Sequence, residues 1–346
     1  MQSPPAHARL IIDTQALAAN WRRFAVASGT AVCGAAIKAD GYGLGARTAL
    51  DTLYAAGARE FFVAHWCEVE ALGSLPEGAR LAVLHGVMPD EIDVALTSEA
   101  RPVLVTAAQV AAWKPTGRPC DVMVDTGMNR LGLSPAEAVS GLLDGLNVDT
   151  LHSHLACAEE GEHPLNARQL ADFAALTAHL PGMRHALANS AGIGLGPDYR
   201  FALTRPGIGL FGGGLGPDGT RLAAVAGLEA RIVQLRDVPA GQSVGYGATF
   251  VAQRPSRVAV VALGYADGYA RSLSNRGTAI VDGVRCPVAG RVAMDLTAFD
   301  VTDAPPLAEG DWLSIDFDLA AAAAAAGRTE YELLTGLGAR YARVCR

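Results

Sequence analysis

Two hydrophobic patterns alternate along most of the first two thirds of the chain. Short apolar runs rich in β-branched and aromatic residues recur from about residue 30 to about residue 212, and longer segments with apolar residues three or four positions apart lie between them. This alternation is typical of βα units that build a parallel sheet. We predict eight strands, which begin at Ala31, Phe61, Leu81, Arg101, Asp121, Thr150, His185 and Arg205.

The longer segments carry helical spacing. They predict helices over Thr14 to Ala27, Ser134 to Leu143 and Asn166 to Leu180. Eight strands with intervening helices predict a TIM barrel, an α/β fold whose active site lies at the C-terminal ends of the strands. A doubly wound open sheet is the alternative, but no G-x-G-x-x-G motif follows any predicted strand, so the usual nucleotide signature of that fold is missing.

The pattern changes after Gly219. Strand-like segments then follow one another, separated by Gly, Pro and Asp turns without regular helices. We therefore expect two domains, a barrel over residues 1–222 and a mainly-β domain over residues 223–346. The alanine run from Ala320 to Ala326 has a high helix propensity and predicts a short helix in the second domain.

The composition narrows the classes of ligand. The 346 residues carry a formal net charge of −7 and no run of Lys or Arg, so neither nucleic acid nor an anionic membrane is an expected partner. The six cysteines contain no C-x-x-C pair, and we predict no metal site. Neither a signal peptide nor a membrane helix is visible in the sequence. We expect a cytoplasmic protein with a small-molecule substrate.

Lys38 ends the first predicted strand and is followed at once by the loop ADGYGLG. This position is the rim at which a barrel holds its active site. A lysine there can be a solvated surface charge. Alternatively, partial burial would lower its pKa and supply the free amine that forms a Schiff base with an aldehyde. The residue and its neighbours leave both interpretations open.

Two polar clusters follow the fifth and sixth predicted strands. Asp125 and Arg130 flank a turn at Gly127, and arginines in such loops are usually solvated. His152 and His154 are two positions apart, so they share one face of a strand. That spacing permits metal ligation, although paired or core histidines are commoner.

Two glycine-rich clusters follow the last two predicted strands. Asn189 and Ser190 belong to ANSAG, and Arg205, Gly207 and Ile208 belong to TRPGIGLFGGG. Together they place hydroxyl, amide and unhindered backbone N–H groups where TIM barrels commonly bind phosphate. The residues alone therefore predict a barrel enzyme with a phosphate-bearing ligand and leave its reaction open.

Eight motifs in one chain resemble those of alanine racemases, the fold-type III pyridoxal-phosphate enzymes. They are AIKADGYGLG, VDTGMNRLGL, SHLACAEE, ANSAG, TRPGIGLFG, VGYGATF, GYADGY and GRVAMD, in the family's order and approximate spacing from Leu10 to the C-terminus. The resemblance implies pyridoxal-phosphate-dependent interconversion of L- and D-alanine, which supplies D-alanine for peptidoglycan or degrades it. It also implies a head-to-tail homodimer with shared active sites.

The resemblance implies two catalytic bases, because racemisation removes a proton from one face of Cα and delivers another to the opposite face. Lys38, which would also carry the cofactor as a Schiff base, would serve one face. Tyr265 of the partner subunit would serve the other. Met294 and Asp295 of the partner subunit would lie near the substrate.

The resemblance also implies a set of residues around the cofactor, namely Tyr42, Arg130, His154, Asn189, Ser190, Arg205, Gly207 and Ile208. The side chains of Tyr42 and Ser190 and the backbone after Arg205 would hold the phosphate. Arg205 would face the pyridine nitrogen, oriented by His154 with Asn189 nearby. Arg130 would hydrogen-bond the cofactor's phenolic oxygen and help to bind the substrate.

The chain departs from the family pattern at four positions. Met123 stands where many members carry a carbamylated lysine that pairs with the arginine equivalent to Arg130, so a bound anion or another carboxylate would have to replace it, or Arg130 is held less firmly. Phe211 replaces a tyrosine and Glu159 an aspartate. Ala339 stands, in a loose alignment, where some members place a tyrosine over the cofactor, which could leave room for a larger substrate side chain.

Three other functions remain open. Met123 and Ala339 motivate a serine or broad-specificity racemase of the same fold. A non-catalytic pyridoxal-phosphate carrier shares the barrel, but such proteins lack GYADGY and GRVAMD. A basic-amino-acid decarboxylase would need a cysteine-bearing acidic motif in the β domain, and GRVAMD is not that motif.

Overall fold

A computed structural model describes residues 6–346 and divides them into two compact units. The first unit is Leu17–Ala223, and the second combines residues 6–16 with Ala224–Arg346. The division differs from the predicted one at the start of the chain, because residues 6–16 belong with the β domain. Within the described residues, no helix has both the length and the apolar character needed to cross a membrane.

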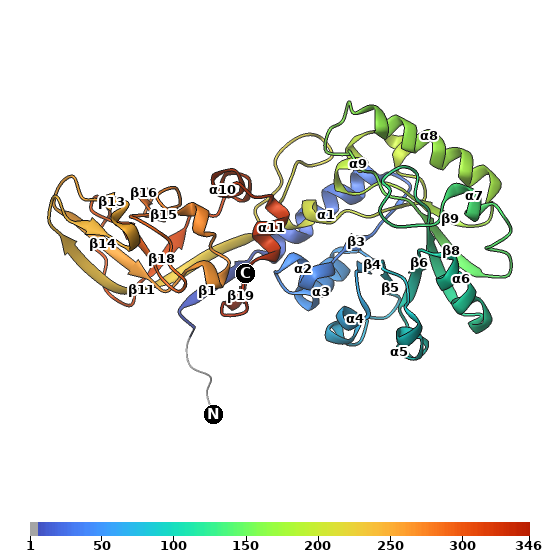
Figure 1. Ribbon diagram of the computed structural model, residues 1–346, viewed down its shortest axis with the longest axis horizontal. Helices are drawn as coiled ribbons and strands as arrows, with labels where there is room; N and C mark the ends of the chain where they lie inside the picture. Colours follow the sequence, from blue (N-terminus) through green and yellow to red (C-terminus); the bar gives the residue numbers. More distant parts are fainter. Residues whose placement is uncertain (1–5) are drawn as a thin grey trace. The chain divides into compact units, whose positions relative to one another are not determined.

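The first unit contains a curved parallel sheet whose strands follow one another in chain order (Figure 1). Its seven strands are β3 (Ala35–Ala36), β4 (Glu60–Val63), β5 (Arg80–Val83), β6 (Arg101–Leu104), β7 (Pro119–Met123), β8 (Asn147–His152) and β9 (Arg184–Ala186). All residues of β4 and β6 are buried. Helices on the outer face and side chains inside therefore cover both faces, as parallel sheets require.

An eighth strand, β10 (Leu203–Thr204), closes the sheet. It pairs in parallel with β2 (Val32–Cys33), which only Gly34 separates from β3. On its other side, the Ala202 N–H donates to the His185 carbonyl at 3.0 Å. A Cβ at position 34 would lie 2.8 Å from the ring of Phe62, so the close approach of the strands requires glycine there. The predicted TIM-like barrel is confirmed.

Helices follow most of the strands. They are α1 (Thr14–Ser28), α2 (Lys38–Tyr42), α3 (Ala46–Ala56), α4 (Trp66–Leu72), α5 (Ile92–Thr97), α6 (Ala107–Trp113), α7 (Pro135–Ala138), α8 (Pro164–His179) and α9 (Ser190–Gly194). In α1, the helically spaced Leu17, Trp21 and Phe24 are all buried, as their spacing predicts.

Two predicted boundaries in the barrel are wrong. The last strand is Leu203–Thr204, and the segment from Arg205 instead forms a loop that leads to a 3₁₀ turn at Ile208–Phe211. The helix predicted over Ser134 to Leu143 ends at Ala138, because turns follow and Gly141 adopts a φ of +87°. In both segments glycine breaks a pattern that the apolar residues alone would continue.

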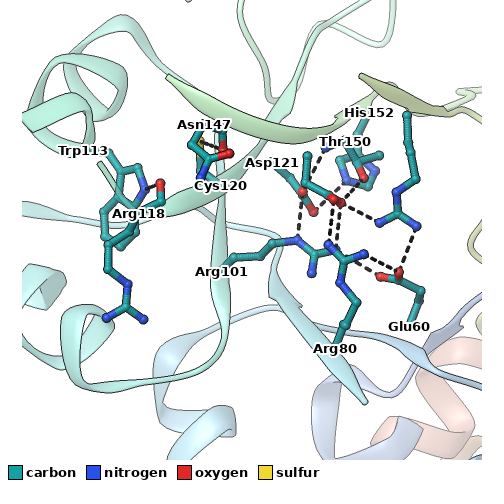
Figure 2. Close-up of polar contacts among 12 residues, drawn as sticks. Glu60, Arg80, Arg101, Trp113, Arg118, Cys120, Asp121, Asn147, Thr150 and His152 are labelled. Carbon is teal, nitrogen blue, oxygen red and sulfur yellow. Dashed lines mark hydrogen bonds and ion pairs between the residues drawn. The ribbon is translucent and has the colours of Figure 1, made fainter. Parts of the chain in front are cut away.

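Charged side chains fill the N-terminal end of the barrel (Figure 2). Arg101, at the start of β6, donates to Glu60 at 3.0 Å and to Asp121 at 2.9 Å. Asp121 also receives a hydrogen bond from the Nε2 atom of His152 at 3.1 Å. All four side chains are buried. Arg80, Asp149 and Arg184 extend this network toward solvent. Each buried charge therefore has an opposite charge as its neighbour.

The second unit is built on an eight-stranded sheet. Its strands are β1 (Ala8–Ile12), β11 (Ala226–Val238), β14 (Ser256–Val261), β15 (Thr278–Val281), β16 (Val284–Pro287), β17 (Thr297–Asp300), β18 (Trp312–Ile315) and β19 (Ala342–Cys345). A small hairpin, β12 (Ser243–Val244) and β13 (Phe250–Val251), accompanies it. The helices are α10 (Leu319–Ala326), as the alanine run predicts, and α11 (Glu330–Thr335).

Strand β1 explains why the start of the chain belongs to the β unit. It pairs antiparallel with β11 and parallel with β19, so it joins strands from the middle and the end of the sequence. Neither pairing partner is local. The hydrophobic pattern of a five-residue strand does not reveal which distant strand it joins, and the sequence prediction therefore missed this exchange.

Candidate active site

Lys38 is separated from the end of β3 by one residue and begins a turn of unusual handedness. Ala39, Asp40, Gly41 and Tyr42 have φ values of +54°, +52°, +60° and +54°, so α2 contains consecutive left-handed residues. For each non-glycine residue this conformation costs roughly 1–2 kcal/mol. The turn is closed by hydrogen bonds, among them Gly41 N–H to the Ile37 carbonyl at 2.8 Å. Such strain persists only where surrounding contacts impose it, and it is common at functional sites.

The amine of Lys38 is partly buried, and its charge is destabilised by its surroundings. Burial lowers its pKa, and the nearby cations Arg130 and Arg205 lower it further, while the carboxylate of Glu68 opposes them. A lowered pKa increases the fraction of free amine at neutral pH, which is the form that attacks an aldehyde. The surroundings of Lys38 therefore favour its free amine more than bulk water does.

A second group of predicted residues forms a cradle of backbone N–H groups. The Oγ atom of Ser190 accepts hydrogen bonds from the N–H of Gly207 at 2.9 Å and of Gly209 at 3.3 Å. The Asn189 side chain caps α9 by accepting from the Gly192 N–H at 2.9 Å. In this structure each of these N–H groups already has an acceptor, and the Ser190 hydroxyl joins the two glycine-rich clusters at the end of the barrel where this fold commonly binds phosphate.

Tyr42, the last residue of the turn Lys38–Tyr42 (the lysine turn), contacts this cradle at Gly207. A Cβ at Gly207 would lie 2.1 Å from the Tyr42 hydroxyl, so the two residues are in close contact and only glycine fits. The ring of Tyr42 stacks on Phe211 with centroids 4.8 Å apart, and Ile208, at the start of the same 3₁₀ turn, is buried. The structure thus joins the first strand end and the two glycine-rich clusters.

Arg205 is buried behind the cradle with part of its hydrogen-bonding capacity unused. Its Nη2 atom donates to the Ser153 carbonyl at 2.6 Å, but within residues 6–346 its Nη1 atom has no hydrogen-bond partner. Burial lowers the Arg205 pKa to about 10, so the guanidinium still remains protonated at neutral pH. A buried donor without an acceptor is costly and fits the ring nitrogen of a bound pyridoxal phosphate.

His154 lies in the electrostatic field of these cations. Burial and the charges of Arg205, Arg130 and Lys38 lower its pKa to about 3, so its imidazole is neutral. No hydrogen bond joins its ring to Arg205 in the described part of the chain, and its proposed orienting role stays a prediction. His152, the other member of the pair, belongs instead to the charged network with Asp121. Residues 6–346 contain no group of three or more potential metal ligands.

The loop around Arg130 is held by Asp125. This carboxylate accepts hydrogen bonds from the N–H groups of Gly127 at 2.7 Å, Met128 at 2.9 Å and Arg130 at 3.0 Å. These bonds keep the Asp125 pKa low despite some burial, which opposes them. The Arg130 guanidinium has no carboxylate partner among the residues that the structure describes, and Met123 is buried and apolar. Within the described residues, no carboxylate therefore takes the place of the carbamylated lysine that many other family members carry at the position of Met123.

The three predicted residues of the β unit also lie together. The N–H of Tyr265 donates to the Ala293 carbonyl at 3.0 Å, and the N–H of Ala266 donates to the Met294 carbonyl at 2.9 Å. The GYADGY and GRVAMD loops are therefore adjacent. Tyr265 and Met294 are 42% and 54% exposed. Asp295 forms an ion pair with Arg340 at 2.7 Å. The loops therefore present one aromatic and one flexible apolar side chain to their surroundings.

Both halves of the chain match family models of one enzyme. The model "Alanine racemase, N-terminal domain" matches residues 12–214, and "Alanine racemase, C-terminal domain" matches residues 225–345. The chain belongs to the alanine racemase family. Curated members support this over nearly their whole lengths: it is 45% identical to the alanine racemase of Acidiphilium cryptum, covering 98% of this chain and 99% of that one.

Other members differ in their stated roles. In Agrobacterium fabrum, the biosynthetic alanine racemase is 43% identical over 97% of this chain and 93% of its own, and the catabolic one is 43% identical over 98% and 92%. Among solved structures, the alanine racemase of Bartonella henselae with covalently bound pyridoxal phosphate has a TM-score of 0.90 and 36% identity, covering 99% of this chain and 100% of that chain. The predicted family is confirmed.

Glu68, whose carboxylate accepts a hydrogen bond from the residue after Lys38, is not among the residues predicted from the sequence. A signal was present, because Glu68 stands three residues after His65 at the start of a helix, the spacing of a capping box. That spacing predicts a helix start. It does not predict that the same carboxylate also contacts a loop 29 positions earlier in the chain.

Proposed function

We propose that this protein uses pyridoxal phosphate to interconvert L- and D-alanine. The observation that carries the proposal is the buried Arg205, whose unpartnered Nη1 atom lies in a barrel that also holds the Ser190 cradle and a lysine with a lowered pKa. Membership of the alanine racemase family, across both domains, points to the same reaction.

The residues present fit the cofactor. Lys38 would bind its aldehyde carbon, and Tyr42, Ser190 and the backbone at Gly207 and Ile208 would hold its phosphate. When bound, pyridoxal phosphate would supply an electron sink that acidifies the Cα proton of the amino acid. Arg205 would donate a hydrogen bond to the ring nitrogen without giving up a proton, because a guanidinium with a pKa of about 10 stays charged at neutral pH.

Two groups, one from each subunit, would move the protons. The Lys38 amine would exchange a proton with Cα on one face, and the phenol of the partner subunit's Tyr265 would do so on the opposite face. Delivery from the second face inverts the configuration, which a single base on one face does not achieve. The Arg130 guanidinium, which pairs with no carboxylate in residues 6–346, would donate to oxygen atoms of the cofactor and the substrate.

The shared site requires a homodimer arranged head to tail. Support comes from the exposure of Tyr265, Met294 and Leu296, large apolar side chains of neighbouring loops that would gain from burial against a second subunit. Met294 and Asp295 of the partner subunit would then lie near the substrate. We place the protein in the cytoplasm. The curated relatives include both biosynthetic and catabolic enzymes, so either supply or degradation of D-alanine fits the family.

Lys38 provides the direct test. Purified protein with pyridoxal phosphate and L-alanine should form D-alanine, and Lys38→Ala should remove both this activity and the absorbance of the covalently bound cofactor. The chain contains only one other lysine, Lys114, which makes Lys114→Ala a matched control that should keep both. After borohydride reduction, the cofactor's mass should appear on the peptide that contains Lys38. Full activity of the Lys38 variant would disprove the proposed role.

A serine or broad-specificity racemase is the second candidate. The small side chain of Ala339 is exposed in the β unit, and Met123 leaves Arg130 without a partner carboxylate, so either position could widen the range of substrates. The same assay with L-serine and larger amino acids separates the two functions. If the rates with these substrates are negligible compared with the rate with alanine, the wider specificity is excluded. The matched C-terminal domain counts against a non-catalytic carrier made of a barrel alone.

A further inference from the structure

Glu68 connects two segments that are far apart in the sequence. One of its carboxylate oxygens accepts hydrogen bonds from the N–H groups of Ala64 at 2.6 Å and His65 at 3.0 Å, where β4 ends. The other oxygen accepts from the N–H of Ala39, the residue directly after Lys38. One side chain therefore joins the end of the second barrel strand to the peptide that follows the lysine.

The contact with Ala39 exceeds what a helix cap requires. Glu91 and Glu137 occupy the same capping-box position in their own segments. Among residues 6–346, the hydrogen bonds that each accepts come from the residue that begins its cap, Met88 or Ser134, and none comes from a distant loop. The third hydrogen bond of Glu68 is thus an addition to a common local motif, and it is directed at the lysine turn.

The lysine turn needs such an external contact. At the start of any helical turn, the first N–H groups have no acceptor within the turn, and the Ala39 N–H is one of these. The left-handed conformation of Ala39, Asp40 and Tyr42 is strained, so it relaxes unless neighbouring groups hold it. Glu68 supplies an acceptor in the position that the left-handed turn presents.

The charge of Glu68 acts at the same place. Burial and the cations Arg130 and Arg205 lower the pKa of Lys38, and Glu68 is the anion that opposes them. His85, which stacks edge-to-face with His65 at 4.2 Å between ring centroids, feels the charges of both Lys38 and Glu68. The carboxylate therefore acts on the lysine through its charge as well as through the backbone.

We propose that Glu68 is a positioning residue for Lys38. By fixing the peptide between Lys38 and Ala39 against the end of β4, it sets the direction in which the lysine side chain leaves the backbone. The inference rests on the proposed function of Lys38 as cofactor anchor and base. Glu68 itself need not touch either cofactor or substrate to have this effect.

The kinetic test compares Glu68→Ala, Glu68→Gln and the matched control Glu91→Gln in the full-length enzyme with cofactor. Displacing a reacting group by a fraction of an ångström costs on the order of tenfold to a hundredfold in rate. We expect kcat to fall by at least about tenfold in Glu68→Ala while KM for alanine changes by less than about threefold. Glu68→Gln, whose amide oxygen can still accept from Ala39, should recover part of the loss. Glu91→Gln should match the unaltered enzyme.

Hydrogen–deuterium exchange supplies a readout that does not depend on activity. In full-length protein without cofactor, Glu68→Ala should speed exchange in residues 39–45 as well as at the start of α4, and it should slow the appearance of bound-cofactor absorbance after pyridoxal phosphate is added. Faster exchange confined to α4, with an unchanged rate of cofactor binding, would reduce Glu68 to a helix cap and overturn the proposal. If Glu68→Ala does not fold, Glu68→Met, which keeps the length of the side chain but has no carboxylate to accept from Ala39, is measured in the same way and decides the question.

Different results would refute the proposed function and the proposed role of Glu68. Absence of racemisation by the unaltered enzyme would refute the proposed function but leave the exchange result intact. Normal racemisation by Glu68→Ala, with unchanged exchange in residues 39–45, would refute only the role of Glu68.

Discussion

At the scale of single residues, the site is built from close contacts that a list of motifs does not convey. Gly207 is an example, because its motif suggests phosphate binding but not the reason for glycine. In the structure, a Cβ there would meet the Tyr42 hydroxyl at 2.1 Å and the adjoining ring carbon at 3.0 Å. The Tyr42 side chain cannot easily move away, because its ring is buried and stacks on Phe211.

Replacing Gly207 by alanine should therefore weaken cofactor binding more than a surface substitution would. Overpacking a buried contact costs about 1–3 kcal/mol of folding free energy, and displacement of Tyr42 should raise the Kd for pyridoxal phosphate by about tenfold or more. Thermal unfolding and cofactor titration measure the two effects. Gly161→Ala is the matched control, since its nearest neighbour would be at an ordinary 3.7 Å. Equal behaviour of the two variants would contradict this explanation.

The sequence predicts which residues belong to this site but not the backbone conformation and contacts that position them. Lys38, Ser190 and Arg205 stand in recognisable motifs, and all three belong to the barrel unit. The left-handed turn after Lys38 was not predictable, because Ala39 and Tyr42 disfavour positive φ and the modest tendency of Asp40 toward it does not predict a run of such residues. The contact of Glu68 with Ala39 depends on how two strand ends meet. Neither local propensity nor hydrophobic periodicity contains that information.

At the scale of elements, the barrel strands carry apolar residues in the middle and charged residues near their N-terminal ends. Asp121 on β7 is fully buried. Burial alone would raise its pKa, but hydrogen bonds from His152 and Arg101 more than offset this and hold the pKa below its usual value. Burial lowers the pKa of His152, so its ring is neutral in the folded protein. Each buried charged side chain near the start of a strand is thus stabilised by polar or charged side chains on the neighbouring strands.

Both shifts predict loss of stability in acid. A carboxyl with a lowered folded pKa stabilises the fold above its unfolded pKa, near 3.9, and this stabilisation is lost as the pH falls through the folded value. A histidine with a lowered folded pKa binds a proton more readily when unfolded, so stability also falls as the pH drops below about 6.5. The free energy of unfolding should therefore decrease between pH 7.5 and pH 5, a range in which histidines with lowered pKa values such as His152 and His154 contribute and Asp121 hardly does.

Asp121→Asn tests this network. Removing one partner of a buried ion pair costs about 3–5 kcal/mol, and we expect a loss of that size in the unfolding free energy at pH 7.5. Denaturant titrations at several pH values would measure it. Asp303→Asn, which breaks the exposed pair with Arg254, should cost at most about 1 kcal/mol. Similar losses in the two variants would show that the buried network does not stabilise the barrel in the way described.

At the scale of the whole molecule, the sequence pattern identified a barrel and a β domain but not how the chain divides between them. β1 comes before the barrel in the sequence and pairs with strands that come after it. Both ends of the barrel segment therefore lead into one sheet. The predicted residues likewise separate into two groups, with Lys38 in one unit and Tyr265 in the other.

This separation leads to a prediction about the dimer. If each active site combines Lys38 of one subunit with the partner subunit's Tyr265, Lys38→Ala and Tyr265→Ala should each be nearly inactive alone. Mixed under conditions that allow subunit exchange, they should form heterodimers in which one site carries both substitutions and the other carries neither. Half of the dimers would then have one intact site of two, which gives about a quarter of the unaltered activity.

The same mixture also distinguishes the alternative. If both residues served the same subunit's site, every site in every dimer would lack one base, and mixing would restore no activity. Subunit exchange is measured separately, by pulling down an affinity-tagged Lys38→Ala subunit and quantifying the untagged Tyr265→Ala subunit that comes with it. Exchanged subunits without recovered activity would refute the shared site, while leaving the chemistry assigned to Lys38 in place.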